Sequence, residues 1–242
     1  MSKIAIFVEG QTELIFTREY LLRHLYQFNI NIKCTKLLRD REEHVPHDQC
    51  NPSSDLFVSI ILVQNDEKVL SAMKDREASL YRCGFEKIIG LRDMYSSNYK
   101  RVSTVVDYCT IREFIMKSKS IIQQFAMPEN ISLIYSIMEI EAWLLAAPNL
   151  FARINDSLSV NNINERLNVD LNNIEVENIF HPANLVMRIY EICGCCYNKT
   201  GDNINCIMDS ITAEDINSML LKSSSFNKFH NEIAGFTTQI VT

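Results

Sequence analysis

The segment Ile4-Ala5-Ile6-Phe7-Val8-Glu9-Gly10-Gln11-Thr12-Glu13 decides the fold class, because it joins a buried strand directly to the start of a helix. A short run of apolar, largely β-branched residues is typical of a strand. Gly10 lets the backbone turn sharply, and Glu13 lies one helical turn further on. In open α/β sheets, ligands bind in the crevice outside the carboxyl ends of the strands. Glu9 is therefore the first candidate functional residue.

The pair Glu9 and Glu13 has two interpretations. Two carboxylates so close in sequence repel each other unless a cation or a proton lies between them, which predicts a divalent metal site. Alternatively, both acids simply favour the positive N-terminus of the helix that begins here. The spacing alone leaves both interpretations open.

Strand and helix patterns alternate through the first 145 residues. We expect strands at residues 3–8, 30–38, 56–63, 87–91 and 131–138, and helices at residues 13–28, 67–83 and 102–125. The polar and apolar residues of 30–38 alternate, as in a half-exposed edge strand, and 44–55 is typical of a polar loop. Strands that alternate with helices imply a mostly parallel sheet flanked by helices. The expected fold class is therefore α/β.

The composition changes after Pro148, where an Asn- and Asp-rich stretch is followed by short helical segments. We expect residues 1–149 to form the α/β domain. Residues 150–242 are expected to form a C-terminal helical appendage packed on it.

Composition limits the class of protein. The chain has 242 residues, of which 47% are hydrophobic. No run approaches the roughly 18 apolar residues that cross a bilayer, and the N-terminus lacks the order of a signal peptide. We therefore expect a cytoplasmic protein that does not interact with membranes.

The charge balance is acidic, with 30 acidic residues, 24 basic residues and a formal net charge of −6. This argues against broad, sequence-blind adhesion to nucleic acid, which needs a basic face. It does not exclude a nuclease, because carboxylates that hold metal ions count as negative charges and the ions reverse the local sign.

Two groups of His and Cys residues have spacings that raise the question of a zinc site. They are His44, His47 and Cys50, and the sequence Cys193-Gly194-Cys195-Cys196. Zinc sites normally combine two separated pairs of ligands, which neither group offers. A solvated loop and surface thiols are the simpler interpretation.

Acidic residues follow three separate strands. Besides Glu9 and Glu13, Asp93 follows the strand at 87–91, and Glu139 and Glu141 follow the strand at 131–138. The carboxyl ends of parallel strands meet at one edge of a sheet, so these acids are expected to converge. Mg²⁺ prefers such oxygen ligands, and divalent ions activate water and stabilise the leaving oxygen in phosphodiester cleavage.

These motifs resemble the toprim superfamily, most closely the toprim-like family that includes AriB, the effector of the PARIS anti-phage system. The nuclease domain of the OLD proteins is a more distant relative. The resemblance rests on three strand-end motifs and one downstream segment, and spans about residues 3 to 200: Val8–Glu13 (VEGQTE), Leu91–Tyr95 (LRDMY), Met138–Leu145 (MEIEAWLL) and Tyr197–Lys199 (YNK).

The resemblance implies a role for each matching residue. Glu9 matches the toprim glutamate, a metal ligand or general acid/base, and Glu13 would add a ligand from the helix. Asp93 matches the first aspartate of the toprim Asp-x-Asp motif. Glu139 or Glu141, of which we favour Glu141, would supply the later acid.

Lys199 would contact the scissile phosphate, unless it is simply a solvated loop lysine. Tyr95 departs from the pattern, because it stands where the second aspartate of Asp-x-Asp would fall. We therefore predict a single Mg²⁺ or Mn²⁺ held by Glu9, Glu13 and Asp93 in preference to a two-metal site. Trp143 is expected in the helix core, and His181 is expected as a cap or surface residue.

The leading hypothesis is a metal-dependent toprim-fold nuclease that acts in phage defence. By resemblance alone, its substrate would be RNA, possibly transfer RNA, and an ABC-type ATPase would be its partner; a homodimer is also conceivable. The alternative is a non-catalytic toprim-fold module of a defence complex, in which Tyr95 reflects lost chemistry. A nucleotide-binding enzyme is less favoured because the chain has no Gly-rich phosphate loop.

Overall fold

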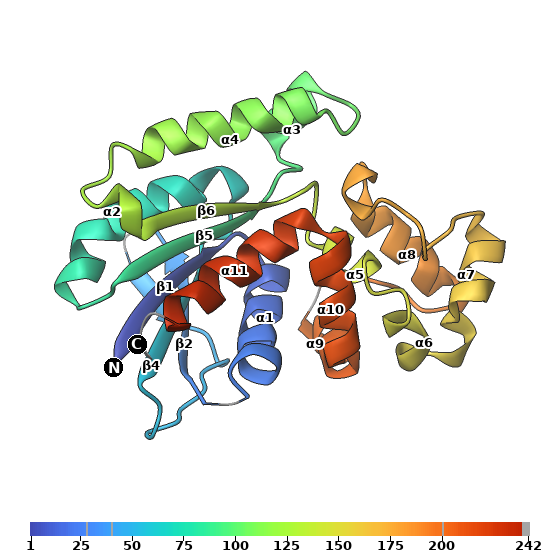
Figure 1. The fold of residues 1–242 in the computed structure, drawn as a ribbon, viewed down its shortest axis with the longest axis horizontal. Helices are drawn as coiled ribbons and strands as arrows, with labels where there is room; N and C mark the ends of the chain where they lie inside the picture. Colours follow the sequence, from blue (N-terminus) through green and yellow to red (C-terminus); the bar gives the residue numbers. More distant parts are fainter. Residues whose placement is uncertain (28, 40, 200, 239–242) are drawn as a thin grey trace. The chain divides into compact units, whose positions relative to one another are not determined.

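The computed structural model describes residues 1–27, 29–39, 41–199 and 201–238 of the chain. The chain divides into two compact units (Figure 1). The first, here called the sheet unit, comprises residues 1–92, 107–135 and 232–242. The second, the helical unit, comprises residues 93–106 and 136–231. The sequence places one boundary at residue 149, whereas residues 93–106 and 136–149 belong to the helical unit.

The sheet unit contains a six-stranded sheet in the order β3-β2-β4-β1-β5-β6. Its strands are β1 (Ser2–Val8), β2 (Asn31–Leu38), β3 (Arg41–His44), β4 (Leu56–Leu62), β5 (Lys87–Asp93) and β6 (Ile131–Ser136). β1 pairs in parallel with β4 and β5, β2 pairs in parallel with β4, and β3 pairs antiparallel with β2. The mostly parallel α/β sheet is therefore confirmed.

One expectation for the sheet was wrong. β2 is not an edge strand, because the polar segment that follows it turns back as β3 and covers its outer side. All four β3 residues are exposed, and the last of them, His44, was expected to start a polar loop.

Alternating residues of the strands face opposite sides of the sheet. Phe7 and its partner Ile61 belong to the core cluster that also contains residues of α2 (Val69–Arg82) and of α4 (Tyr108–Ile122). Within the sheet unit, α2 and α4 cover this face and α1 (Gln11–Glu19) covers the other (Figure 1). Gly90 lies on the α2 face, where an added Cβ would come within 2.6 Å of the side chains of Leu133 and Met73.

The helices of the sheet unit begin and end for local reasons. α1 continues as a π-helix, η1 (Tyr20–Leu25), and the 3₁₀ turn η2 (Asp66–Lys68) leads into α2. The helix expected at residues 102–125, with one break allowed for, begins later, as α4; the preceding α3 (Ser97–Val102) belongs to the helical unit and overlaps the expected helix only at Val102. The break occurs because the Asp107 carboxylate accepts hydrogen bonds from the amides of Cys109 (3.1 Å) and Thr110 (3.3 Å) and so starts a new helix. The 3₁₀ turn η3 (Pro128–Asn130) precedes β6.

The helical unit is built from short elements. They are α3, α5 (Glu141–Leu145), α6 (Leu150–Ile154), η4 (Asp156–Leu158), α7 (Val160–Leu167), η5 (Val176–Asn178), α8 (Pro182–Ile192), α9 (Gly201–Ser210), α10 (Ala213–Lys222) and the first half of α11 (Ser224–Thr238). Trp143 lies fully buried in their core, with ring centroids 5.2 Å from Phe226 and 5.5 Å from Phe229. Trp143 is thus a core residue, as expected.

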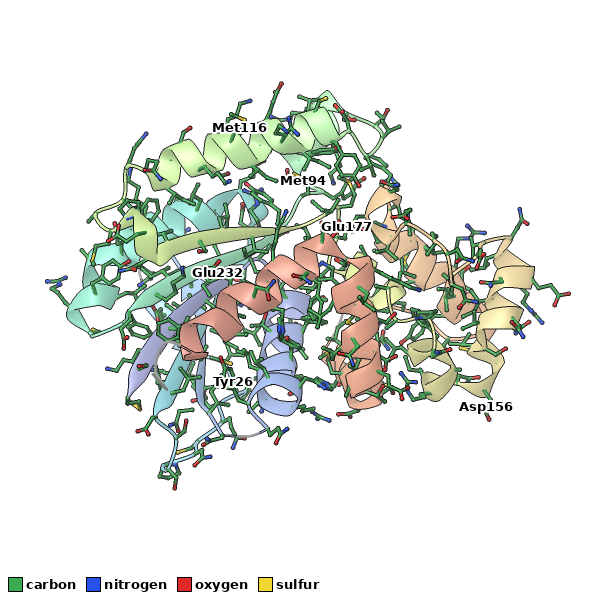
Figure 2. The ribbon with its side chains drawn as sticks, in the orientation of Figure 1. Tyr26, Met94, Met116, Asp156, Glu177 and Glu232 are labelled. Atoms are coloured by element: carbon green, nitrogen blue, oxygen red, sulfur yellow. The ribbon has the colours of Figure 1, made fainter. Side chains whose placement is uncertain are left out.

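The second half of α11 belongs to the sheet unit. There the Glu232 carboxylate (labelled in Figure 2) accepts a hydrogen bond from the Ser132 hydroxyl at 2.5 Å. It also forms an ion pair with Lys87 at 2.5 Å. These contacts link the second half of α11 to β5 and β6. Among the described residues, no helix has both the length and the apolar character that crossing a membrane requires.

Candidate functional site

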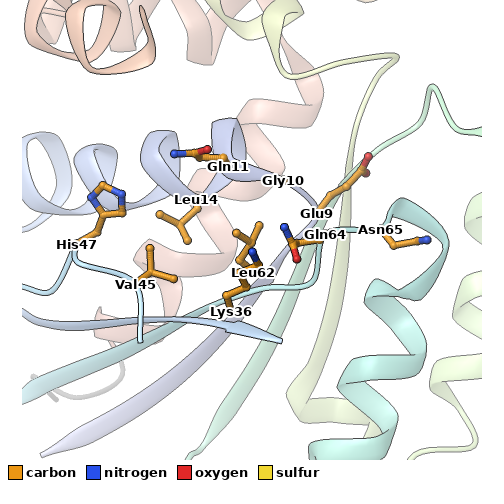
Figure 3. A pocket seen from close by; sticks show the side chains of 10 residues that line it. All are labelled: Glu9, Gly10, Gln11, Leu14, Lys36, Val45, His47, Leu62, Gln64 and Asn65. Atoms are coloured by element: carbon orange, nitrogen blue, oxygen red, sulfur yellow. The ribbon is translucent and has the colours of Figure 1, made fainter. Parts of the chain in front are cut away.

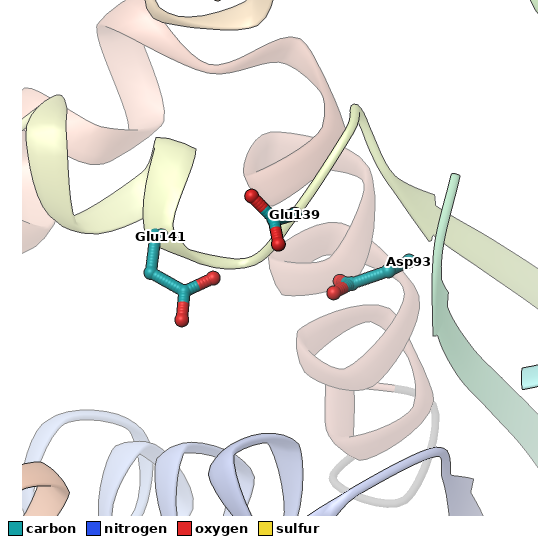
Figure 4. Close-up of side chains that lie close together, drawn as sticks. All are labelled: Asp93, Glu139 and Glu141. Carbon is teal, nitrogen blue, oxygen red and sulfur yellow. The ribbon is translucent and has the colours of Figure 1, made fainter. Parts of the chain in front are cut away.

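Three of the predicted acids form a compact cluster in the helical unit. Asp93 is the last residue of β5, Glu139 lies in the turn after β6, and Glu141 is the first residue of α5. One carboxylate oxygen from each lies within 4.8 Å of the others. Figure 4 shows Asp93 and Glu141 pointing inward from opposite sides of Glu139. We call these residues the acidic triad; it could bind a metal ion.

A strained turn brings Glu139 and Glu141 to the same place. Met138 has a φ of 65°, in the left-handed region that a large side chain rarely adopts. The amide of Glu139 donates to the carbonyl of Ile137 (3.1 Å), and the Met138 carbonyl accepts from the amide of Tyr95 (2.8 Å). Strain of this kind persists only where the surrounding structure imposes it, and it is common at functional sites. The turn explains why both glutamates join the cluster, although we favoured Glu141 alone.

Asp93 is held by its neighbours in the turn. Its side chain accepts hydrogen bonds from the Ser136 hydroxyl and from the amide of Ile140, the latter at 3.0 Å. Because the residue is only 6% exposed, these donors keep the carboxylate in one orientation.

The two glutamates differ in environment. Glu139 accepts from the amide of Ala183, near the start of α8, at 3.0 Å. Glu141 is fully buried and accepts from the Tyr197 hydroxyl at 2.8 Å. Burial raises the pKa of Glu141; Lys199 and Tyr197 act against this rise, and Glu139 adds to it. Glu141 therefore resists ionisation until a cation compensates its charge.

Lys199 supplies one such cation. Its Nζ atom lies 3.3 Å from Glu139 Oε1 and 3.1 Å from Glu141 Oε1. The side chain is 42% exposed, so it can leave the triad without crossing a packed core. A metal ion bound by the same two carboxylates would compete with this ammonium group.

Tyr95 contacts aromatic residues beside the triad. Its hydroxyl lies 3.5 Å from Nε2 of His181, its ring centroid lies 5.3 Å from that of Phe180, and Lys100 Nζ lies 4.3 Å from the ring centroid. Burial and the charge of Glu139 raise the pKa of the Tyr95 hydroxyl. His181 occupies the N-cap position of α8, as expected, but makes no side-chain capping bond there; its ring instead contacts Tyr95.

Glu9 and Glu13 belong to the sheet unit. Glu13 Oε2 accepts from the amide of Gly10 at 2.8 Å at the N-terminus of α1, where the alternative interpretation placed it. Glu9 lines a pocket of about 540 Å³ with, among others, Lys36 and Gln64 (Figure 3). That Glu9 and Glu13 share one metal with Asp93 stays a prediction.

Sequence reasoning missed two groups that orient the triad, the Ser136 hydroxyl and the Ala183 amide. Ser136 ends the strand that leads to Glu139, so its position gave a usable signal. The Ala183 amide comes from a helix start 44 residues away and has no local signature.

The two suspected zinc clusters do not assemble. Within the described residues, the acidic triad is the one group of three or more His, Cys, Asp or Glu side chains with ligand atoms close enough to hold a metal. His44 contacts Asp48 at 3.0 Å, and all eight cysteines are free.

Comparison with known protein families gives one match, described as Domain of unknown function (DUF4276), over residues 8–234. No curated protein and no solved structure matches the chain. The matched region includes Glu9, Lys199 and the whole acidic triad. Because the match spans nearly all of the chain, this protein belongs to the DUF4276 family.

Proposed function

We propose that this protein is a metal-dependent nuclease in which the acidic triad holds a divalent cation. The observation that carries the proposal is the convergence of Asp93, Glu139 and Glu141 within 4.8 Å at the carboxyl ends of β5 and β6. Carboxylate oxygens are the ligands that Mg²⁺ and Mn²⁺ prefer. A bound ion would supply Lewis acidity and an activated water for phosphodiester hydrolysis.

The other residues of the site have roles of their own in this proposal. Lys199, when it leaves Glu139 and Glu141, retains its charge and can contact a phosphate of the substrate. Tyr197 orients the Glu141 carboxylate, and Ser136 orients that of Asp93. Glu9 is proposed as a further ligand or general acid/base.

The biological role follows from the resemblance to the toprim superfamily. By analogy with the family that includes AriB, we propose a cytoplasmic anti-phage effector, released or activated by an ABC-type ATPase partner. RNA, possibly transfer RNA, is the proposed substrate, and a homodimer is a possible assembly. These assignments rest on the motifs at Val8–Glu13, Leu91–Tyr95 and Met138–Leu145.

A non-catalytic interaction module is a second candidate, and two specific observations favour it. The ammonium group of Lys199 already lies beside two acids of the triad, and Tyr95 stands where a further acidic ligand would be expected. In this case the ion pairs with Lys199 would simply stabilise the helical unit.

The two candidates are separated by a cleavage assay with end-labelled RNA and DNA of one sequence, in EDTA, Mg²⁺ or Mn²⁺. A parallel set of the same reactions also contains the proposed ATPase partner. If the triad holds the metal, Asp93→Asn should reduce cleavage by about 100-fold or more. Replacing a residue that only orients a metal ligand already lowers metal affinity or activity by about 10–100-fold. The control Asp156→Asn removes an exposed acid of the same unit and should leave cleavage unchanged.

Metal binding is measured separately by titrating Mn²⁺ into both variants and following the melting temperature. A protein that cleaves neither substrate, with or without the partner, and shows no Mn²⁺-dependent stabilisation would contradict the nuclease and favour the module.

A further inference from the structure

A cation-lined groove lies in the sheet unit, between the turn that joins β2 to β3 and helix α2. Its volume is about 1170 Å³. Among the described residues that line it, four are cationic, against one acid, Asp75: Arg39, Arg41, Lys68 and Arg76. In a chain whose net charge is −6, such a local excess of positive charge indicates a surface for an anionic partner.

Two of these cations are engaged within the protein. Arg41 pairs with Glu43 at 2.8 Å, and Arg76 pairs with Glu42 at 2.9 Å. Arg39 and Lys68 are exposed, and neither makes an ion pair with any residue in the described ranges. They are therefore the two groups that can neutralise an external charge at little cost.

The backbone of the groove is strained at two of its lining residues. Arg39 has a φ of 47° and Gln64 a φ of 64°, both in the left-handed region although neither is glycine. Such a residue persists where the surroundings impose its conformation, often at ligand-binding sites. The strain is an observation independent of the charge, and it falls on the same groove.

The groove adjoins the pocket in Figure 3, because Gln64 and Asn65 line both. This pocket lies at the carboxyl ends of β1 and β4, two neighbouring strands followed by helices on opposite faces of the sheet. Such a switch point is where open α/β sheets bind their ligands. Its wall combines polar amides with apolar side chains, including Leu14 and Leu62.

We infer that this groove binds the phosphate backbone of an unpaired nucleic-acid strand. Arg39 and Lys68 contact phosphates, and the side-chain amide of Gln64 presents hydrogen-bonding groups to a base at the mouth of the pocket. The Asn65 side chain can add only its NH₂ group, because its Oδ1 accepts from the Glu67 amide at 3.0 Å. Asn and Gln side chains are well suited to base edges. The inference deepens the proposed function by naming an unpaired strand as the substrate, and it rests on that function.

The test is binding without cleavage. A fluorescein-labelled single-stranded 20-mer, as RNA and as DNA, is titrated with the full chain in EDTA, and anisotropy is recorded from low to high salt. For single strands, each phosphate contact adds about 0.7 to the log–log salt slope. The variant R39Q/K68Q should therefore lower the slope by about 1.4 and weaken binding about 25-fold at 0.1 M salt.

The matched control is K117Q/K119Q, which removes the same charge from the exposed side of α4, outside the groove. It should bind as the unmodified chain does, and R39K/K68R should retain the salt slope. Melting temperatures check that all variants are folded. Equal binding by R39Q/K68Q and its control would overturn the inference, as would groove-dependent binding to anionic vesicles with none to either oligonucleotide.

This outcome is distinguishable from failure of the nuclease proposal. If the chain binds the oligonucleotide through the groove in EDTA but never cleaves it with metal, the groove stands and the catalytic proposal fails. If it cleaves with metal while R39Q/K68Q binds normally, only the groove assignment fails.

Discussion

Lys199 Nζ lies 3.1 Å from Oε1 of Glu141, and Glu141 is fully buried. The ammonium group thus occupies a position beside the triad that favours a positive charge. The same carboxylates cannot be fully satisfied by Lys199 and by a metal ion at once. This competition makes Lys199 the most informative residue to change.

Replacing Lys199 by Met should tighten Mn²⁺ binding by about three- to tenfold. The reason is that a partly exposed charge, worth about 1 kcal/mol, no longer repels the cation. Isothermal titration at pH 8 measures the affinity. If Lys199 contacts substrate phosphate, the same variant should cleave more slowly even with saturating Mn²⁺. Weaker Mn²⁺ binding by the variant would show that Lys199 does not compete with metal.

Replacing Glu141 by Gln should raise the melting temperature in metal-free buffer at neutral pH. Burial raises the pKa of Glu141, so the ionised form opposes folding at pH values above the pKa of the unfolded chain. The neutral amide avoids this cost but is a poorer ligand. The variant should therefore lose the stabilisation that Mn²⁺ gives to the unmodified chain. A lower melting temperature without metal would mean that the charged pair with Lys199 is net stabilising.

Glu177 should stabilise the protein in a pH-dependent way. Its carboxylate accepts from Ser223 Oγ (2.9 Å), Ser224 Oγ (2.7 Å) and the Ser225 amide (2.7 Å) at the start of α11. Burial alone would raise the pKa of Glu177, but these hydrogen bonds lower it overall. A lowered folded-state pKa gives stability that is present above the unfolded pKa and lost as the pH falls through the folded value.

Glu177→Gln should therefore cost about 1–2 kcal/mol of unfolding free energy at pH 7, the usual value of a helix cap. The cost should shrink when urea unfolding is repeated below pH 4. The exposed Glu165→Gln is the control and should change little at either pH. A Glu177→Gln cost that is the same at both pH values would contradict a role for the ionised carboxylate.

Truncating Trp143 should destabilise the helical unit strongly. The side chain is fully buried, and its indole N–H donates to Ser225 Oγ at 2.8 Å. Trp143→Ala should cost about 3–5 kcal/mol, a large share of a typical stability of 5–15 kcal/mol. Circular dichroism during urea unfolding measures the change. A cost near zero would mean that Trp143 is not packed as the structure has it.

The sheet and much of the helix content could be predicted because both follow from local patterns. Buried parallel strands such as β4 read as continuous apolar runs, and Gly84 (φ 80°) ends α2 as a helix-terminating glycine should. The prediction that β2 is an edge strand was wrong, because no local feature of its sequence shows that β3 will pair with its outer side. A single break in the helix at residues 102–125 was an open alternative, and the structure places it at the cap Asp107.

The sequence by itself determined that acidic residues follow two strands, near Asp93 and Glu139, because the ends of the apolar runs mark the ends of the buried strands. Only the tertiary structure decided that Glu139 and Glu141 meet in one cluster, through the left-handed turn at Met138. It also decided that Lys199 pairs with them. Periodicity records which side of an element is buried, whereas the contacts between distant segments depend on the path of the whole chain.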